Sequence, residues 1–250
     1  TQLPSNSHYE IVIGKDKLYY ASDDETAFDL DRPLTSGEER SNSAEQLFQQ
    51  AEEYHALRQY TTAMNRYLSC LDQDPDHKAA LHRVSEIYLR NGEYKKALNY
   101  THKALEDDAY DAAANFIHGI IHKKLGDMLL AKEAFGWAAR STEYRTSASL
   151  QFAQIGILRN NYTQAESKVL QALRNDESNI SALQLLSVIY RKTGRTQQAR
   201  DINAKILSLD PLNHFARFEN LMLDPGRQNS QAFTSLIRNE LPHETYLELA

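Results

Sequence analysis

The stretch NGEYKKALNYTHKALEDDAYD, residues 91–111, carries the pattern on which the fold assignment depends. Ala97 and Ala104 lie seven positions apart in it, which places both on one face of a helix, and Gly92 stands in the turn before that helix. The same arrangement returns every 34 residues, and the alanine column that marks it consists of Ala63, Ala97, Ala131, Ala165 and Ala199. A regular period of this length predicts stacked copies of one helical hairpin.

Three further columns keep the same period. Nine positions before the alanines, a mostly aromatic column contains Tyr54, Tyr88, His122, Gly156 and Tyr190. Twelve positions before them, a small-residue column contains Ala51, Ser85, Gly119, Ala153 and Ser187. Seven positions after them lie Cys70, Ala104, Ala138, Ala172 and Ile206. Small residues let two helix backbones approach closely while larger ones fill the groove beside them, so the columns predict tightly paired helices.

A turn column separates the two helices of each unit and consists of Arg58, Gly92, Gly126, Asn160 and Gly194. Glycine and asparagine tolerate the left-handed backbone conformation that closes a helix. Arg58 departs from this preference, so we expect the first turn to have a different backbone. The expected N-caps of the helices that open the following repeats are Asp76, Asp111, Ser178 and Asn213.

These columns resemble the tetratricopeptide repeat family, whose 34-residue pattern has aromatic, glycine and alanine positions. The resemblance covers residues 43–213 and divides them into five repeats, 44–77, 78–111, 112–145, 146–179 and 180–213. It implies an all-α, right-handed superhelical solenoid of antiparallel helix pairs that binds proteins or peptides in its concave groove. Chaperone-binding members of the family grip a carboxylate with a lysine and an asparagine. This chain has Phe48 and Glu52 at those positions, so that role is not expected.

The two ends of the chain depart from the repeats. Residues 1–42 are expected to form an N-terminal arm, with a β-hairpin in YEIVIGKDKLYY (9–20) and then an acidic linker. Residues 214–250 are expected to hold a degenerate sixth helix pair, 214–223 and 230–239, and the start of a further repeat. Because the chain opens without methionine and ends within the pattern, we expect a fragment of a larger multidomain protein. The junction of the arm with the repeats resembles large bacterial proteins in which a β-rich domain precedes such repeats.

The composition of the 250 residues narrows the classes of function. The formal net charge of -6, from 34 acidic and 28 basic residues, argues against general nucleic-acid binding. No apolar run reaches the roughly 18 residues needed to span a bilayer, so membrane insertion is not expected. The single cysteine, Cys70, excludes an intrachain disulfide and a cysteine zinc cluster. The compartment and the oligomeric state stay open at this stage.

No residue pattern predicts catalysis, and neither a cofactor nor a metal is expected. The one spacing typical of a metal site is that of His118 and His122, but Gly119 stands where a zinc-protease motif needs its glutamate. Both histidines occupy packing positions of the repeat, so we interpret them as core residues. Cys70 also lies in a packing column and is interpreted as a buried, inert thiol.

The first helix of each repeat is expected to line the concave face, where two kinds of residue gather. An apolar floor is expected from Phe116, Ile120, Leu150, Ile157, Leu158 and Val188, with Gln154 among them. A basic row is expected from Arg90, Lys123, Lys124, Arg159, Arg191 and Lys192. An apolar floor with a charged rim is typical of a peptide-binding groove. A competing interpretation is that the N-terminal arm or a tighter superhelix fills this floor.

The sequence therefore predicts a protein-protein interaction scaffold and not an enzyme. The predicted partner is a protein or peptide that carries apolar residues with acidic flanks, because these complement the floor and the basic row. The alternative is a structural accessory module of a larger multidomain protein, such as an enzyme with a preceding β-rich domain.

Overall fold

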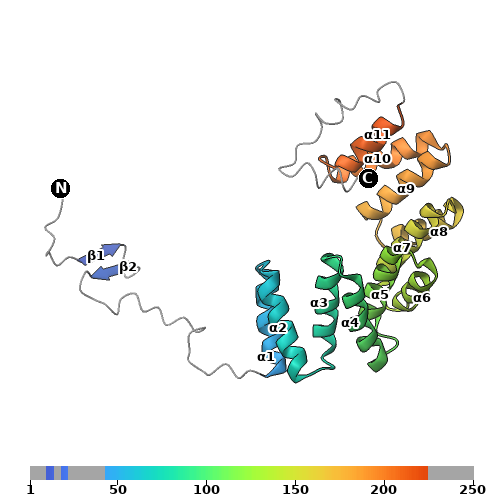
Figure 1. Ribbon diagram of the computed structural model, residues 1–250. Coiled ribbons are helices and arrows are strands. Elements are labelled where there is room, and N and C mark those ends of the chain that lie inside the picture. The colour runs from blue at the N-terminus through green and yellow to red at the C-terminus, as the bar shows by residue number, and fades with distance from the viewer. Residues whose placement is uncertain (1–9, 14–17, 22–42, 225–250) are drawn as a thin grey trace.

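Helix-forming runs alternate with tight turns, and they fold into antiparallel helix pairs that follow one another along an arc (Figure 1). The computed structural model describes residues 10–13, 18–21 and 43–224. Near the N-terminus, β1 (Glu10–Ile13) and β2 (Leu18–Ala21) pair antiparallel, with Glu10 opposite Ala21. The expected acidic linker, the 230–239 helix and the start of a further repeat lie outside the described residues.

Eleven helices occupy the described part of the chain after residue 42. Ten of them form five pairs: α1 (Ala44–Ala56) with α2 (Tyr60–Gln73), α3 (Lys78–Arg90) with α4 (Tyr94–Asp107), α5 (Ala112–Leu125) with α6 (Met128–Ala138), α7 (Arg145–Leu158) with α8 (Tyr162–Asn175), and α9 (Ile180–Lys192) with α10 (Thr196–Leu209). A further helix, α11 (His214–Met222), follows the last pair. The predicted all-α solenoid of antiparallel helix pairs is confirmed.

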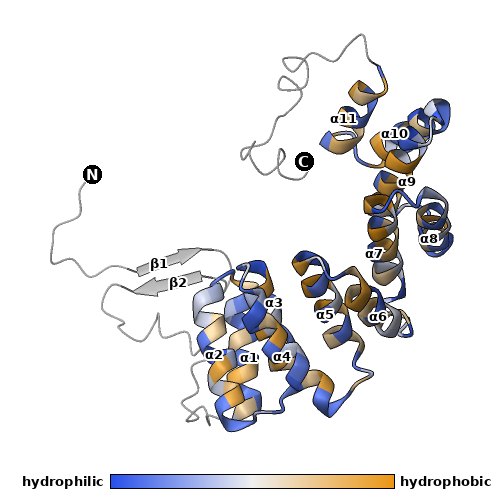
Figure 2. Ribbon diagram, turned by 45° about the vertical axis from the view of Figure 1, so that its right-hand side comes forward, coloured by the Kyte–Doolittle hydropathy of each residue, from blue (hydrophilic) through white to orange (hydrophobic). Residues whose placement is uncertain are grey.

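The core lies between the paired helices, where the sequence columns meet. All five residues of the alanine column are fully buried. The small-residue column faces larger side chains of the second helix: Gly119 lies against the ring of Phe135, and Ser187 donates a hydrogen bond to Asn203 Oδ1 at 2.6 Å. In Figure 2 the hydrophobic residues lie along the sides of the helices, as expected for helices that bury one face. The columns therefore mark the interfaces between helices.

All five turns between paired helices contain a residue with a left-handed backbone. Gly92, Gly126 and Gly194 have φ values of 76°, 86° and 75°, and Asn160 has φ 57°. Arg58 has φ 59°, so the expectation of a different first turn is wrong. Repeat packing fixes the geometry of the hairpin, and Arg58 adopts it although a side chain with a Cβ is disfavoured there.

Side chains satisfy the first free backbone N–H groups of most first helices. The observed N-caps of α3, α5, α9 and α11 are His77, Asp111, Asn179 and Asn213. Two of these are the predicted residues, and the other two lie one position after the predicted Asp76 and Ser178. The reason is a preceding turn: the N–H of Asp76 donates to Asp74 Oδ1, and the N–H of Ser178 donates to Asp176 Oδ1.

Candidate functional site

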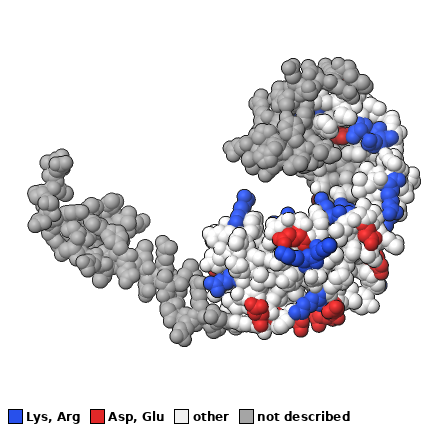
Figure 3. Space-filling view, in the orientation of Figure 1, with Lys and Arg blue, Asp and Glu red and all other residues white. Residues whose placement is uncertain are grey.

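A groove of about 670 Å³ opens where α1, α3 and α5 lie side by side. Its lining comes from these three first helices and from the residues just before α7, so the first three repeats contribute to it. The lining residues are Phe48, Ala79, His82, Arg83, Glu86, Leu89, Arg90, Ala113, Phe116, Ile117, Ile120, Glu143 and Tyr144. Figure 3 shows the hollow side of the arc, with lysine and arginine side chains along its rim.

Aromatic contacts hold the apolar floor of this groove in place. The ring of Phe116 lies 5.7 Å from the buried ring of Phe135 and 5.3 Å from that of Tyr144. At the other end, the ring of Phe48 lies 5.7 Å from that of Tyr67. The rings of Phe48 and Phe116 are partly exposed on the groove side and packed against other rings on the core side. The floor is therefore preformed.

One wall of the groove is a ladder of alternating charges. Arg83 donates two hydrogen bonds to the carboxylate of Glu52, at 2.8 and 2.9 Å, and a third to Glu86 at 3.2 Å. Arg90 donates to the other oxygen of Glu86 at 2.9 Å. Burial opposes ionisation of Glu52, but hydrogen bonds from Arg83 and the Tyr67 hydroxyl outweigh it and lower the pKa of the carboxyl. The ladder is internally neutralised.

The residues of the predicted basic row differ in their surroundings. Arg90 is paired with Glu86, as above, and Arg191 is paired through two hydrogen bonds of 2.6 and 2.9 Å with the buried Glu219 of α11. Lys123 is half-buried and donates to two glutamines of α7. The other three, Lys124, Arg159 and Lys192, are exposed. The structure thus separates neutralised cations from free ones, which spacing alone could not do.

The predicted apolar floor is divided between two places. Phe116 and Ile120 line the groove together with the predicted Arg90. Leu150 and Ile157 pack against the core cluster between α7 and α9, Val188 is half-buried on α9, and Leu158 is 65% exposed at the end of α7. The structure brings three of the thirteen predicted site residues into the groove.

The sequence did not point to several of the groove residues, among them Arg83, Ile117 and Tyr144. The column of N-cap residues could have drawn attention to the start of α7. The residue 34 positions after Asp111 is Arg145, whose side chain has no acceptor oxygen and therefore cannot cap a helix N-terminus. As a result α7 has Tyr144 at its N-cap without a side-chain cap hydrogen bond. Its ring instead covers Phe116 and closes the end of the groove.

Comparison with known proteins agrees with this architecture. The family profile described as the TT21 fifth ARM repeats domain matches residues 44–157. The solved structure of PilW, a type IV pilus biogenesis factor, superimposes with a TM-score of 0.68 at 20% identity over 82% of this chain and 96% of that one. The chain has the fold of tetratricopeptide repeat proteins.

Two further solved structures share this fold. Pseudomonas aeruginosa pilF has a TM-score of 0.67 and 15% identity, over 84% of this chain and 99% of that one. YrrB, described as a TPR protein with an unusual peptide-binding site, has a TM-score of 0.56 and 20% identity, over 73% and 94% of the two chains. At such identities the likeness shows the fold alone. No curated protein sequence matches the chain.

Two histidines, His118 and His122, form a hydrogen-bonded chain with Thr101 in which both imidazoles are neutral. Thr101 Oγ1 donates to the Leu98 carbonyl, so His118 Nδ1, 2.9 Å away, donates to that hydroxyl. His118 Nε2 then accepts from His122 Nε2 at 3.0 Å. Burial, with repulsion from His122 and His102, lowers the pKa of His118 to about 4. Within the described ranges no group of three or more potential ligands is arranged to hold a metal ion.

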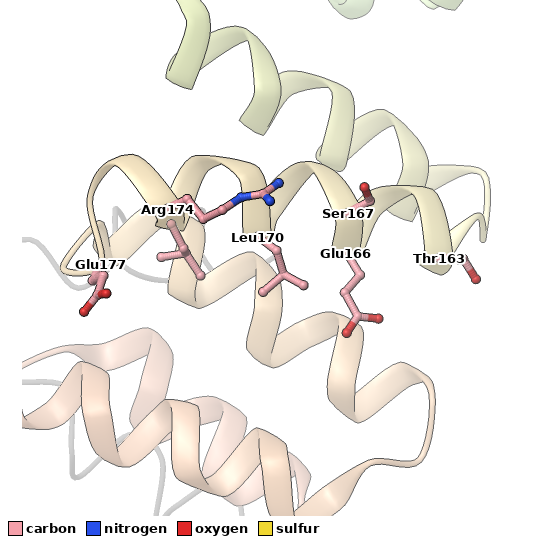
Figure 4. A pocket seen from close by; sticks show the side chains of 7 residues that line it. Thr163, Glu166, Ser167, Leu170, Arg174 and Glu177 are labelled. Carbon is pink, nitrogen blue, oxygen red and sulfur yellow. The ribbon is translucent and has the colours of Figure 1, made fainter.

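A second depression, of about 680 Å³, lies along α8 (Figure 4) and is lined by Thr163, Glu166, Ser167, Leu170, Leu173, Arg174 and Glu177. All of these residues belong to α8 or to the turn after it. Glu166 is already paired with Arg195, at 2.7 and 2.8 Å. The groove on the first helices combines side chains from three repeats and is the stronger candidate. In the described part of the repeat protein, no helix is both long and apolar enough to cross a bilayer.

Proposed function

We propose that this repeat protein is a scaffold that binds a segment of a protein partner in the groove between α1, α3 and α5. The predicted right-handed winding of the solenoid would place these first helices on its inner side. The observation that carries the proposal is the preformed floor of Phe48, Phe116, Ile117 and Ile120 beneath a neutralised charged wall. Partly exposed aromatic and branched side chains in a concave site are typical of binding hot spots.

The size of the groove suits a short segment and not a whole domain face. A volume of about 670 Å³ is within the range of sites that enclose a few side chains of a ligand. The fold supports the same role, because each repeat contacts its neighbours and leaves an extended surface for partners. The partner is expected to carry large apolar residues with acidic flanks. The YrrB structure, which shares the fold, is described as having a peptide-binding site.

The test uses substitutions that fill the groove without touching the core. Ala113 lines the groove and is partly exposed, so Ala113→Trp should occupy the space of a ligand side chain. Ser181 stands in the same repeat column two repeats later, is exposed and lies outside the groove, so Ser181→Trp is the matched control. Partners captured by the wild-type chain would be reduced to their binding segments and titrated against each variant by isothermal calorimetry.

We expect Ala113→Trp to weaken binding at least tenfold and Ser181→Trp to leave it unchanged. Circular dichroism spectra and unfolding midpoints of both variants should match those of the wild type, because neither residue belongs to the buried columns. Equal binding by Ala113→Trp and the wild type would place the partner elsewhere on the repeat protein.

A further inference from the structure

The inner faces of successive first helices meet at a junction that repeats along the solenoid. A residue near the end of one first helix contacts a residue 28 positions later, on the next first helix. At the last such junction Arg191 of α9 binds the carboxylate of Glu219 on α11, and at the junction two repeats earlier Lys123 of α5 binds Gln151 of α7. Arg191 therefore has an acidic partner, whereas the equivalent Lys123 has an amide.

Lys123 has a half-buried positive charge that no nearby carboxylate neutralises. Its ammonium group donates to Gln151 Oε1 at 2.5 Å and to Gln154 Oε1 at 2.6 Å. None of the ion pairs found among residues 43–224 includes this lysine. Burial, together with the neighbouring charge of Lys124, lowers the pKa of Lys123 to about 8. A charge held out of water without a counter-ion is unfavourable, so an arriving anion would be stabilised there.

The donors around Lys123 suit a carboxylate. Two of the three ammonium N–H groups point to the glutamine carbonyl oxygens, which leaves the third ammonium N–H and the two amide NH₂ groups as donors. Hydrogen bonds with an ionised partner are among the strongest in proteins. Ile120 lies one turn before Lys123 on the same helix and lines the groove, so the charge and the apolar floor are neighbours.

We propose that Lys123, Gln151 and Gln154 form a subsite for an aspartate or glutamate side chain of the segment that binds in the groove. This inference rests on the proposed function and specifies the chemistry of the ligand. The other cations near the groove, Arg83 and Arg90, already have carboxylate partners, so Lys123 selects the acidic residue.

The helix geometry also sets the spacing within the ligand. Ile120 and Phe116 precede Lys123 by three and seven residues, which is about 4.5 and 10.5 Å along α5 at about 1.5 Å per residue. An extended segment advances about 3.3 Å per residue and directs alternate side chains to the same side. A residue two positions from the acidic one therefore lies about 6.6 Å away, between Ile120 and Phe116. For a segment that runs extended along α5, the ligand motif is an acidic residue with a large apolar residue two positions away.

A random peptide library, fused through its C-terminus so that every carboxylate is a side chain, would be selected on the full chain. The variant is Lys123→Met, which keeps the aliphatic stem and removes the charge, and the matched control is Lys124→Met, which removes the adjacent exposed charge. Peptides recovered with the wild type would then be synthesised with the acidic residue or its amide and titrated against all three proteins. Circular dichroism spectra and unfolding midpoints confirm folding.

The wild type should recover peptides with the acidic and apolar residues two positions apart. Replacing the acidic residue by its amide should weaken binding roughly tenfold or more. Lys123→Met should bind the acid and amide peptides within about twofold of each other, while Lys124→Met keeps the preference. Recovery of apolar peptides without an acidic preference would overturn this subsite, and so would an acidic preference that survives in Lys123→Met. In either case the proposed binding function of the groove would still stand. If no peptide is enriched, or if enrichment persists in Ala113→Trp, both the subsite and the proposed function fail.

Discussion

Gly119→Ala should destabilise the protein, although alanine is the better helix former. A Cβ atom at residue 119 would lie 2.6 and 2.7 Å from Cε1 and Cδ1 of Phe135, and 3.0 Å from Cζ. The Phe135 ring is fully buried and has the rings of Phe116 and Phe152 at 5.7 and 6.2 Å, so it has little room to move. The added methyl group must displace either the ring or the whole of α6.

The magnitude follows from two opposing effects. Overpacking a buried contact costs about 1–3 kcal/mol. Replacing glycine by alanine within a helix returns up to about 1 kcal/mol. We therefore expect the free energy of unfolding to fall by about 1–2 kcal/mol. Because Phe116 forms the groove floor, a displaced Phe135 ring should also weaken binding of any segment that depends on that floor.

The chain itself supplies the compensating substitution. In the next repeat the equivalent pair is Ala153 and Val169, both fully buried. Phe135→Val alone should leave a cavity and destabilise by about 2–3 kcal/mol. The double variant with Gly119→Ala recreates the pair of the next repeat, so it should be more stable than the sum of the two single changes predicts, by about 1–2 kcal/mol.

Urea denaturation followed by circular dichroism and by the fluorescence of Trp137, the single tryptophan, measures all four proteins. Trp137 lies two positions after Phe135 on α6, so its emission reports on the affected repeat. A Gly119→Ala midpoint at or above that of the wild type would refute the reasoning, and so would strictly additive effects in the double variant.

Three further substitutions test the turns and the histidine chain. Arg58→Gly should raise the urea midpoint by the equivalent of about 0.5–1 kcal/mol, because Arg58 has φ 59°. Gly92→Ala is its control: nothing lies within 4 Å of the added Cβ, so it should lower the midpoint through the backbone alone. A lower midpoint for Arg58→Gly together with a higher one for Gly92→Ala would contradict this account. As the pH falls from about 6.5 toward 4, the free energy of unfolding of the wild type should fall by on the order of 1–3 kcal/mol. The reason is that the unfolded chain takes up a proton in this range, whereas folded His118, with its pKa of about 4, does not. His118→Gln should lose less over the same range in urea titrations, and parallel pH profiles would argue against the neutral chain.

The sequence by itself determined the repeat architecture of this protein. A 34-residue period with small residues at two columns specifies which helix faces meet, because helix packing depends mainly on side-chain volume at a few contact positions. The alanine column is buried as the spacing predicts. The left-handed turns at Gly92, Gly126, Asn160 and Gly194 follow from residue type in the same way.

Only the tertiary structure decided the composition of the groove and the state of its charges. Arg90, Lys123 and Arg191 look alike in the sequence, yet two have a carboxylate partner and Lys123 has amides. That difference depends on which side chains of neighbouring first helices come within hydrogen-bond distance, and this is set by how the repeats stack. The same holds for Tyr144, which closes the groove from a position before α7, and for Arg58, whose left-handed backbone is imposed by the hairpin around it. Spacing along a chain specifies faces of helices, whereas contacts between repeats depend on their relative placement in space.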